Sequence, residues 1–184
     1  MKQAMPRAYL AVAGSALLLS AVTARAQSGP PRPGPEHKKL EYYVGKWTSE
    51  SEVKANPFMP AGKYTSQDDC TLLDGGFAVM CRSDGSGPTG ATKGVGIMGY
   101  SAEDKIYTYY GVDSAGRVPT TVARGTATGD TFVYNDESKM NGKVLKSRYT
   151  IKQAGPTSYT FKWEMQGDGG TWTSLMEGKA TKGN

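Results

Sequence analysis

Histidine and cysteine are scarce in this chain, which has one His and two Cys among 184 residues. Most protein sites for zinc, haem iron and other transition metals use His or Cys ligands, and several nucleophilic mechanisms need a histidine base. The one histidine, His37, lies between Glu36 and Lys38 and has no partner that would complete a metal site or a catalytic set. We therefore expect no haem, no bound metal and no other cofactor, and we interpret His37 as a solvent-exposed residue.

Concentrated charge and long apolar runs are also missing from most of the chain. Lys and Arg number 22 against 17 Asp and Glu. Lys2, Arg7 and Arg25 lie in the N-terminal segment, so 19 basic residues remain against 17 acidic ones, a net charge of +2. No basic run with interleaved aromatics occurs, which argues against a nucleic-acid partner. A membrane span needs about 20 apolar residues, so a membrane-spanning protein is not expected either.

The first 26 residues have the pattern of a secretory signal peptide. Basic residues precede an apolar run from Ala8 to about Val22, and Ala24-Arg25-Ala26 places small residues at the cleavage positions. The alternative, an uncleaved anchor, calls for a longer apolar run. We expect a soluble mature protein, periplasmic or secreted, that begins near Gln27. Residues 27–35 are rich in Pro and Gly and are expected to form an extended tether.

Residues 36–184 are expected to form a single all-β domain. Short turn signals rich in Gly, Asn, Asp and Pro recur along this segment, and the stretches between them are rich in Thr, Val, Tyr and Phe. This pattern is typical of an antiparallel meander. The predicted strands are residues 46–55, 62–73, 77–84, 92–100, 105–112, 117–127, 131–139, 143–153, 158–166 and 171–181.

About ten sequential antiparallel strands would leave unpaired edges, and closure into an up-and-down barrel removes them. A two-residue turn at Asn141-Gly142 places Phe132 opposite Ile151 and Tyr134 opposite Tyr149, all on one face. The next two hairpins are predicted to continue this face by pairing Tyr149 with Phe161, Ile151 with Tyr159, Trp163 with Ser174, Met165 with Trp172 and Phe161 with Met176. The alternation predicts an apolar, aromatic interior.

The segment HKKLEYYVGKW, residues 37–47, predicts a short helix before the first strand. Leu40, Tyr43 and Val44 share a face at helical spacing, and Gly45 can take the left-handed conformation that ends a helix. Trp47 then opens the first strand. We expect the helix to plug one end of the barrel, with Trp47 packed beneath it.

Three segments carry a resemblance to a known family. EHKKLEYYVGKW, GIMGYSAEDKIYTYYGVDS and SYTFKWEMQGDGGTWTSLMEGKATK resemble an uncharacterised bacterial domain-of-unknown-function family of small exported lipocalin-like proteins. The resemblance implies a calycin-type barrel, and it implies almost nothing about function. The Gly-x-Trp opening is similar to that of lipocalins, yet no arginine follows Arg148 to stack on Trp47. Lys179 or Lys182 would have to substitute.

The two cysteines are predicted to form a disulfide. A two-residue turn at Gly75-Gly76 places Cys70 directly opposite Cys81. Opposite residues of such a hairpin have Cα atoms about 4.5 to 5.5 Å apart, a distance that a disulfide spans. Export would permit oxidation. The alternative is a pair of buried free thiols.

The predicted interior suggests that the protein binds a small apolar or amphipathic ligand. The candidate contacts are Arg124, Phe132, Tyr134, Asp136, Tyr149, Phe161, Trp163 and Met176, and Ser49, Ser51 and Ser174 are expected to face inward as well. Arg124 faces inward only if Thr128-Gly129-Asp130 forms a three-residue loop, because a two-residue Gly129-Asp130 turn sends it to the surface. An inward Arg124 would hold an anionic group.

Other functions stay open on the sequence alone. Side chains could fill the lumen, in which case the protein would act through its loops as an envelope interaction protein or an inhibitor, with an unknown protein partner. An enzyme activity is not indicated, because no catalytic set or phosphate-binding glycine motif occurs. Residues 85–94 are interpreted as a flexible loop at the mouth, and residues 56–62 as a lid or a loop folded back on the core.

Overall fold

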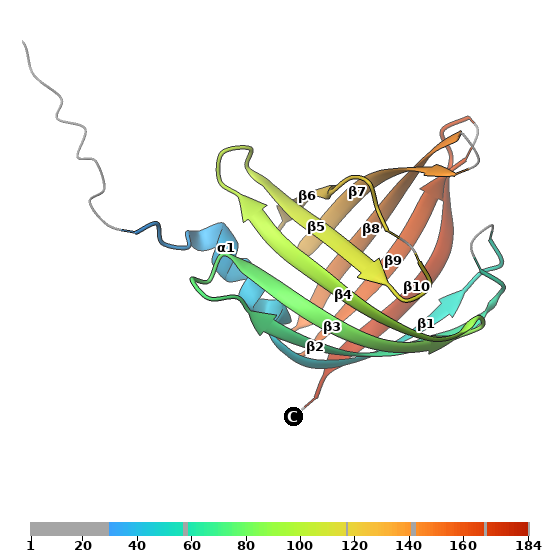
Figure 1. Cartoon of the computed structure of the whole chain (residues 1–184), viewed down its shortest axis with the longest axis horizontal. Helices are drawn as coiled ribbons and strands as arrows, with labels where there is room; N and C mark the ends of the chain where they lie inside the picture. Colours follow the sequence, from blue (N-terminus) through green and yellow to red (C-terminus); the bar gives the residue numbers. More distant parts are fainter. Residues whose placement is uncertain (1–29, 57–58, 117, 141–142, 168, 184) are drawn as a thin grey trace, which may run out of the picture. The chain divides into compact units, whose positions relative to one another are not determined.

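The computed structural model describes residues 30–56, 59–116, 118–140, 143–167 and 169–183. The predicted signal peptide, the Asn141-Gly142 turn and the tip of the 56–62 loop lie outside these ranges. Arg32–Asn184 form one compact unit (Figure 1). Its elements are α1 (Pro35–Lys39), the 3-10 helix η1 (Leu40–Tyr43), β1 (Gly45–Val53), β2 (Gly62–Leu72), β3 (Ala78–Gly87), β4 (Gly90–Ser101), β5 (Ile106–Asp113), β6 (Ala123–Thr128), β7 (Thr131–Met140), β8 (Lys143–Gly155), β9 (Ser158–Gln166) and β10 (Trp172–Lys182).

The ten strands form a closed antiparallel barrel. Each strand pairs with its neighbour in sequence, and β1 also pairs with β10, which closes the sheet. The predicted fold class, an all-β up-and-down barrel of calycin type, is confirmed. Closure satisfies the backbone hydrogen bonds of both terminal strands, which an open sheet would leave exposed.

Two connections differ from the sequence-based prediction. Residues 85–94 are not a flexible loop, because β3 and β4 run through them and pair as far as Gly87 and Gly90. Glycines at these positions admit a bulky neighbour: a Cβ on Gly85 or Gly87 would collide with the side chain of Tyr64. In contrast, β6 begins only at Ala123, so most of the predicted strand 117–127 belongs to the β5–β6 connection.

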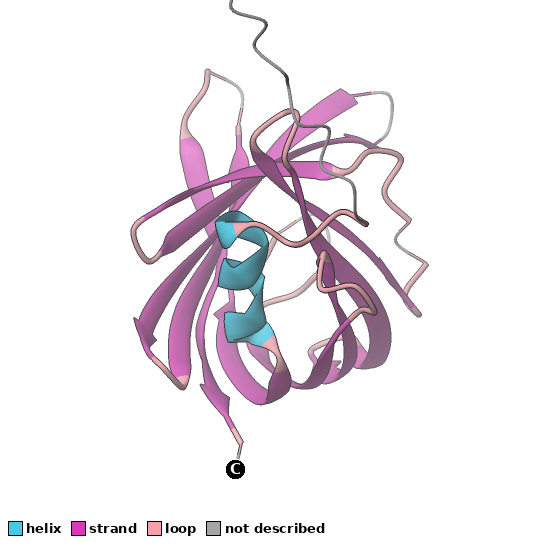
Figure 2. Ribbon diagram, turned by 90° about the vertical axis from the view of Figure 1, so that its left-hand side faces the viewer, coloured by secondary structure: helices cyan, strands magenta, loops and turns pink. Residues whose placement is uncertain are grey.

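The predicted helix lies across one end of the barrel (Figure 2). Leu40 and Tyr43 are buried in the core, and Gly45 has a φ of +120°, a conformation that favours glycine. Trp47 is buried, and its Nε1 donates a 2.8 Å hydrogen bond to the Tyr43 carbonyl oxygen. This bond fixes the helix over the first strand, as the sequence predicts.

Lys182 takes the place of the arginine that lipocalin-like barrels stack on their tryptophan. Its Nζ lies 4.9 Å from the centroid of the Trp47 ring and donates a 3.0 Å hydrogen bond to the Tyr42 carbonyl oxygen. The cation thus joins the helix end to the last strand, and of the two lysines proposed for this role Lys182 is the one that performs it.

His37 is buried, so the expectation of a solvent-exposed histidine is wrong. Its Nδ1 accepts a 3.1 Å hydrogen bond from the Gly34 backbone N–H, within the first turn of the helix. The ring makes edge-on contacts with Phe77 and Tyr100, with centroids 5.1 and 5.4 Å away. His37 therefore caps the helix and helps to seat it on the barrel.

The predicted register is correct for one hairpin and wrong for the next two. Phe132 pairs with Ile151 and Tyr134 with Tyr149, as expected. Irregularities between Gln153 and Gly155 and between Ser174 and Met176 then shift the pairing. The observed pairs are Tyr149 with Trp163, Ile151 with Phe161, Gln153 with Tyr159, Ser174 with Glu164, Met176 with Trp163 and Trp172 with Gln166.

The second irregularity changes the face of two residues. Trp172 and Ser174 share the outer face with Glu164, whereas the sequence predicts them inside. On that face the Arg148 guanidinium lies 4.4 Å from the Trp172 ring centroid and 2.7 Å from a Glu164 carboxylate oxygen. The aromatic ring and the two charges form an external cluster and contribute nothing to the lumen.

The predicted disulfide is confirmed. Cys70 pairs with Cys81 across β2 and β3, and their sulfur atoms are 2.03 Å apart. No free cysteine occurs among the described residues. Cys70 faces inward beside the helix end, so the bond lies in the wall of the core and not at its surface.

Candidate functional site

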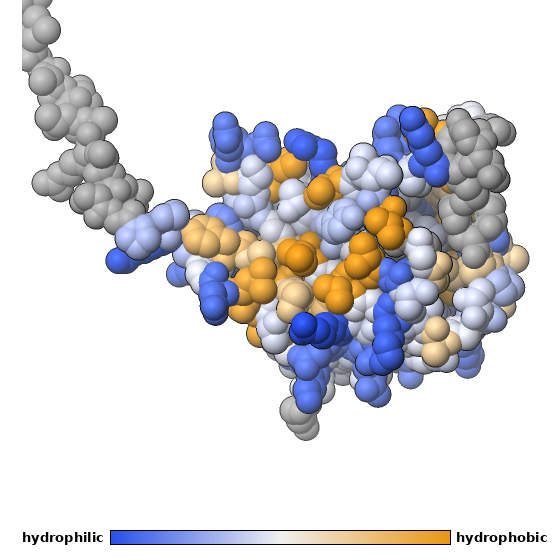
Figure 3. All heavy atoms as spheres, in the orientation of Figure 1, coloured by the Kyte–Doolittle hydropathy of each residue, from blue (hydrophilic) through white to orange (hydrophobic). Residues whose placement is uncertain are grey.

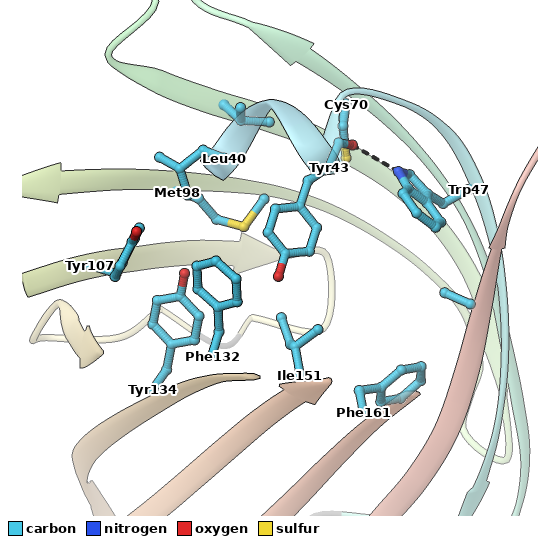
Figure 4. Packing of buried hydrophobic residues seen from close by; sticks show 12 residues of the cluster. Leu40, Tyr43, Trp47, Cys70, Met98, Tyr107, Phe132, Tyr134, Ile151 and Phe161 are labelled. Atoms are coloured by element: carbon cyan, nitrogen blue, oxygen red, sulfur yellow. Dashed lines mark hydrogen bonds between the residues drawn. The ribbon is translucent and has the colours of Figure 1, made fainter. Parts of the chain in front are cut away.

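The half of the barrel beside the helix is packed solid. Tyr43 extends from the helix toward Phe132 and Ile151, and Met98, Tyr107 and Tyr134 close around them (Figure 4). Phe132, Tyr134 and Phe161, three of the candidate ligand contacts, lie in this layer and are buried. The structure therefore places them in the core that supports the site, and they are not available to a ligand in this arrangement.

Beyond this core several inward-facing side chains are only partly covered by other residues, and we call this half of the lumen the hollow. Tyr109 faces inward, since it pairs with buried Met98, yet 42% of its surface is exposed. Burial nevertheless raises the pKa of its hydroxyl, with smaller contributions from Asp68 and Asp113. Tyr109 therefore points into the barrel, but other side chains do not cover it completely. Five other inward side chains are also only half-buried: Asp68, Ser83, Tyr149, Trp163 and Met176. Inward Ser49, Ser51 and Ser66, in contrast, are buried.

Aromatic rings in the lumen lie flat against glycines of the barrel wall. A Cβ on Gly96 or Gly111 would come 2.8 or 2.6 Å from the Tyr109 side chain, and one on Gly125 would come 2.7 Å from the Tyr134 ring. These distances are far shorter than ordinary carbon contacts of about 3.5 to 4.0 Å. The glycines thus let these rings approach the backbone of the barrel wall closely.

One inner wall carries a chain of hydroxyl groups that ends at a carboxylate. The Ser49 and Ser66 Oγ atoms are 2.8 Å apart, and Ser66 Oγ donates a 3.0 Å hydrogen bond to Asp68 Oδ2. Ser83 lies opposite Asp68 on β3, where its hydroxyl favours the charged form of this carboxylate. Burial raises the pKa of Asp68, and the Ser83 and Ser66 hydroxyls partly offset that effect.

Asp136 faces inward near the opposite end of the barrel from the helix, as predicted, and is half-buried. Its Oδ1 accepts a 3.0 Å hydrogen bond from Thr121 Oγ1 in the β5–β6 connection. Asp113 occupies a second inward position at the same end, opposite Gly94. These carboxylates place negative charge at the mouth of the hollow.

Arg124 lies on the outer face, so the prediction of an inward guanidinium is wrong. The hairpin closes with the two-residue Gly129-Asp130 turn, in which Thr128 pairs with Thr131 and Arg124 with Asn135. Arg124 is exposed, and Gly125 takes the inward position opposite Tyr134. Arg124 is therefore not placed to bind an anion inside the barrel.

Of the remaining candidates, Tyr149, Trp163 and Met176 lie together on β8, β9 and β10. Trp163 pairs with both of the others across adjacent strands. Tyr149 stacks on Phe161 of the packed layer, with centroids 5.8 Å apart. The three side chains form the aromatic and thioether wall of the hollow, and this wall adjoins the serine and carboxylate wall of β1 to β3 where β10 pairs with β1.

Asp68 is not among the candidate contacts predicted from the sequence. A signal existed, because Asp68 and Ser66 precede Cys70 by two and four positions, and an inward cysteine fixes the inward set of its strand. The pairing of Cys70 with Cys81 would thus have pointed to Ser66, Asp68 and Ser83.

Two other hollows and one surface patch differ from the lumen. Hollows of about 430 and 250 Å³ lie outside the helix end and share Tyr42, Asp130 and Gln153. On the outer face of β4 and β5, exposed Val95, Ile97 and Val112 form part of an apolar patch (Figure 3). None of these three places combines aromatic walls with an enclosed charge, so the lumen is the better candidate site.

The described part of the chain shows neither a metal-binding cluster nor a membrane-spanning helix. In the ranges that the structure describes, no group of three or more His, Cys, Asp or Glu residues is placed to hold a metal ion. None of the described helices has the length and apolar character needed to cross a bilayer.

Solved structures with this fold include two natural proteins. An S-type phycobiliprotein lyase, CPES from Guillardia theta, is 16% identical with a TM-score of 0.54, over 81% of this chain and 93% of that one. Rv2717c from M. tuberculosis is 12% identical with a TM-score of 0.58, over 82% of this chain and 99% of that one. At such identities the likeness establishes the fold alone.

Sequence comparison gives the family. No curated protein matches the chain. Over residues 32–182 the sequence matches the family described as "Protein of unknown function (DUF1579)", so the resemblance to a domain-of-unknown-function family is confirmed and the chain belongs to that family.

Proposed function

We propose that this protein binds a small apolar or amphipathic ligand in the half of the barrel that the helix does not fill. The partial exposure of inward-facing Tyr109 carries the proposal, because a fully packed lumen would cover it. Aromatic rings held against the wall and a few convergent polar groups are the features expected of a small-molecule site. Tyr149, Trp163, Met176 and Asp136 stay as proposed contacts.

The proposal includes export to the periplasm or the exterior. The Cys70–Cys81 disulfide supports it, because such bonds persist in oxidising compartments. The expected mature chain begins at Gln27. N-terminal sequencing of protein purified from its native host tests this, and a chain that still begins at Met1 would argue against it.

Binding of the neutral dye Nile red tests the lumen directly, with two variants that separate the inside from the outside. Met176→Trp adds a large ring to the hollow and should weaken dye binding about tenfold or more while leaving the fold intact. Val95→Lys places a charge on the outer apolar patch and should have no effect.

The second candidate function is an interaction with another protein, and the exposed patch of Val95, Ile97 and Val112 is the observation that favours it. Dye binding that Val95→Lys abolishes and Met176→Trp leaves unchanged would support that function and contradict the lumen proposal. Native mass spectrometry of the purified protein adds an independent test, since a retained small molecule is expected for a binder.

A further inference from the structure

The deepest charge in the hollow is the carboxylate of Asp68. It lies in the wall between Trp47 on β1 and Ser83 on β3, two residues before the disulfide-bonded Cys70. The Ser66 hydroxyl fixes the carboxylate by a hydrogen bond, and the Ser49–Ser66 contact in turn fixes Ser66. The group is therefore held in one place without help from any ligand.

No cation of the protein neutralises this carboxylate in the part of the chain that the structure describes. The ion pairs there do not include Asp68. Among the inward positions whose side chains are described, the only basic residue is Lys182, which lies against Trp47 and the Tyr42 carbonyl oxygen at the helix end. Asp136 adds further negative charge toward the mouth.

This distribution is the reverse of that on residues 27–184, where 19 basic residues against 17 acidic ones give a formal net charge of +2. Arg82, opposite Asp69, and Arg148, opposite Glu164, project outward from the strands. A cavity of one charge sign with low-dielectric walls concentrates ligands of the opposite sign. The lumen is thus built to admit a cation and to reject an anion.

Aromatic side chains surround the carboxylate. Its charge contributes to the raised pKa values of Tyr109, Tyr149 and Tyr159, after the larger effect of burial, so all three phenol groups lie within its electrostatic reach. Trp47 is its neighbour across β1 and β2. The faces of such rings attract cations, and more strongly where water is excluded.

Resting on the lumen-binding function proposed above, we propose that the ligand carries a protonated amine. The amine pairs with the Asp68 carboxylate, and the apolar body of the ligand lies along Tyr109, Tyr149 and Trp163. An unpaired buried carboxylate is costly, and a bound ammonium group supplies both the countercharge and hydrogen-bond donors. The free protein already holds the carboxylate without a countercharge before any ligand binds. This arrangement makes the site selective for a cationic head group.

Three probes with the same body and different head groups test the proposal: 3-phenylpropylamine, 3-phenylpropan-1-ol and 3-phenylpropanoate. Isothermal titration calorimetry at pH 7 with the oxidised, mature protein should rank them in that order. The amine is expected to bind about tenfold more tightly than the alcohol, which corresponds to about 1.4 kcal/mol. The carboxylate should bind most weakly.

The variant Asp68→Asn should abolish the preference for the amine and leave the affinity for the alcohol nearly unchanged. Asp69→Asn is the matched control, because it removes the same charge one residue away on the outer face, opposite Arg82. Its ranking should equal that of the parent. The comparison of head groups in the parent protein stands even if a variant folds poorly.

The outcomes separate the two proposals. If the alcohol or the carboxylate binds the parent as tightly as the amine, the lumen is a binding site and the amine inference is wrong. If amine preference persists in Asp68→Asn and is lost in Asp69→Asn, the cation site lies outside the barrel and the inference is also wrong. If none of the three probes binds and Nile red binding is insensitive to Met176→Trp, the lumen-binding proposal itself fails.

Discussion

A methyl group at Gly178 tests the statement that rings lie against a glycine wall. Gly178 on β10 lies opposite Ser51 on β1 and Phe161 on β9. In Gly178→Ala, the new Cβ would come 2.5 Å from Phe161 Cζ and 2.6 Å from Ser51 Cβ, and closer still to the Glu50 carbonyl oxygen. The ring can turn away, but the atoms of β1 belong to the barrel wall and cannot move without disturbing its hydrogen bonds.

The expected cost follows from these overlaps. Overpacking of this kind costs about 1 to 3 kcal/mol, and replacing Gly by Ala in a strand returns about 0.5 to 1 kcal/mol. We expect a net loss of about 1 kcal/mol in the free energy of unfolding, which corresponds to a fall in Tm of about 2 to 4 °C for a domain of this size. Phe161 should also turn into the hollow and weaken Nile red binding.

Thermal unfolding followed by circular dichroism measures the effect, with Gly167→Ala as the matched control. A Cβ on Gly167 meets its nearest neighbour, the Thr171 carbonyl oxygen, at an ordinary 3.8 Å. That variant should lie within about 0.5 kcal/mol of the parent. If Gly178→Ala were as stable as Gly167→Ala and bound the dye normally, the rings would not lie on the wall.

Three further predictions concern stability. Reduction of the Cys70–Cys81 bond, whose sequence separation is 11, should lower the free energy of unfolding by about 3 kcal/mol in the chain-entropy description; chemical denaturation with and without reductant measures it, and coincident curves would contradict it. Asp68→Asn should be more stable than the parent at pH 7, because burial raises the folded-state pKa of this carboxyl. The folded protein then holds the proton more tightly, so the parent loses stability as pH rises through the folded-state pKa. The gain should vanish below about pH 4, and a gain that persists there would refute this reasoning. Tyr134→Phe should match or exceed the parent by about 1 kcal/mol in thermal unfolding, since the buried Tyr134 hydroxyl has no hydrogen-bond partner among the described residues; a clear loss would show that the hydroxyl has one.

The sequence predicts the architecture well because alternation and turn chemistry are local signals. The two-residue turn that the sequence predicts gives the observed pairing of Phe132 with Ile151, and the same logic predicts the disulfide of Cys70 with Cys81 correctly. The helix, Gly45 and Trp47 also follow from spacing alone. Such features depend on a few neighbouring residues, so long-range structure does not override them.

The errors come from single-residue changes in register. The irregularity before Met176 moves Trp172 and Ser174 to the outer face, and no residue type marks it in advance. Arg124 depends on the difference between a two-residue and a three-residue turn, which reverses every side chain of the strand. How far the packed core extends into the barrel is also not a local property. Phe132 and Phe161 face inward as predicted, but Tyr43 of the 3-10 helix packs on Phe132, and Phe161 is buried in the same cluster.

The pairing of β1 with β10 has a consequence for how the chain folds. Tyr42 and Lys182, which meet at this seam, are 140 positions apart in sequence. Their encounter must overcome a large loop-closure entropy, and folds dominated by such distant contacts form slowly. Until β10 arrives, β1 presents an unpaired edge able to recruit strands from other chains. Pairing of β1 with β10 is therefore the step that converts a partly folded, aggregation-prone chain into the native barrel. Substitutions in these two strands should reduce the yield of folded protein more than they reduce its equilibrium stability.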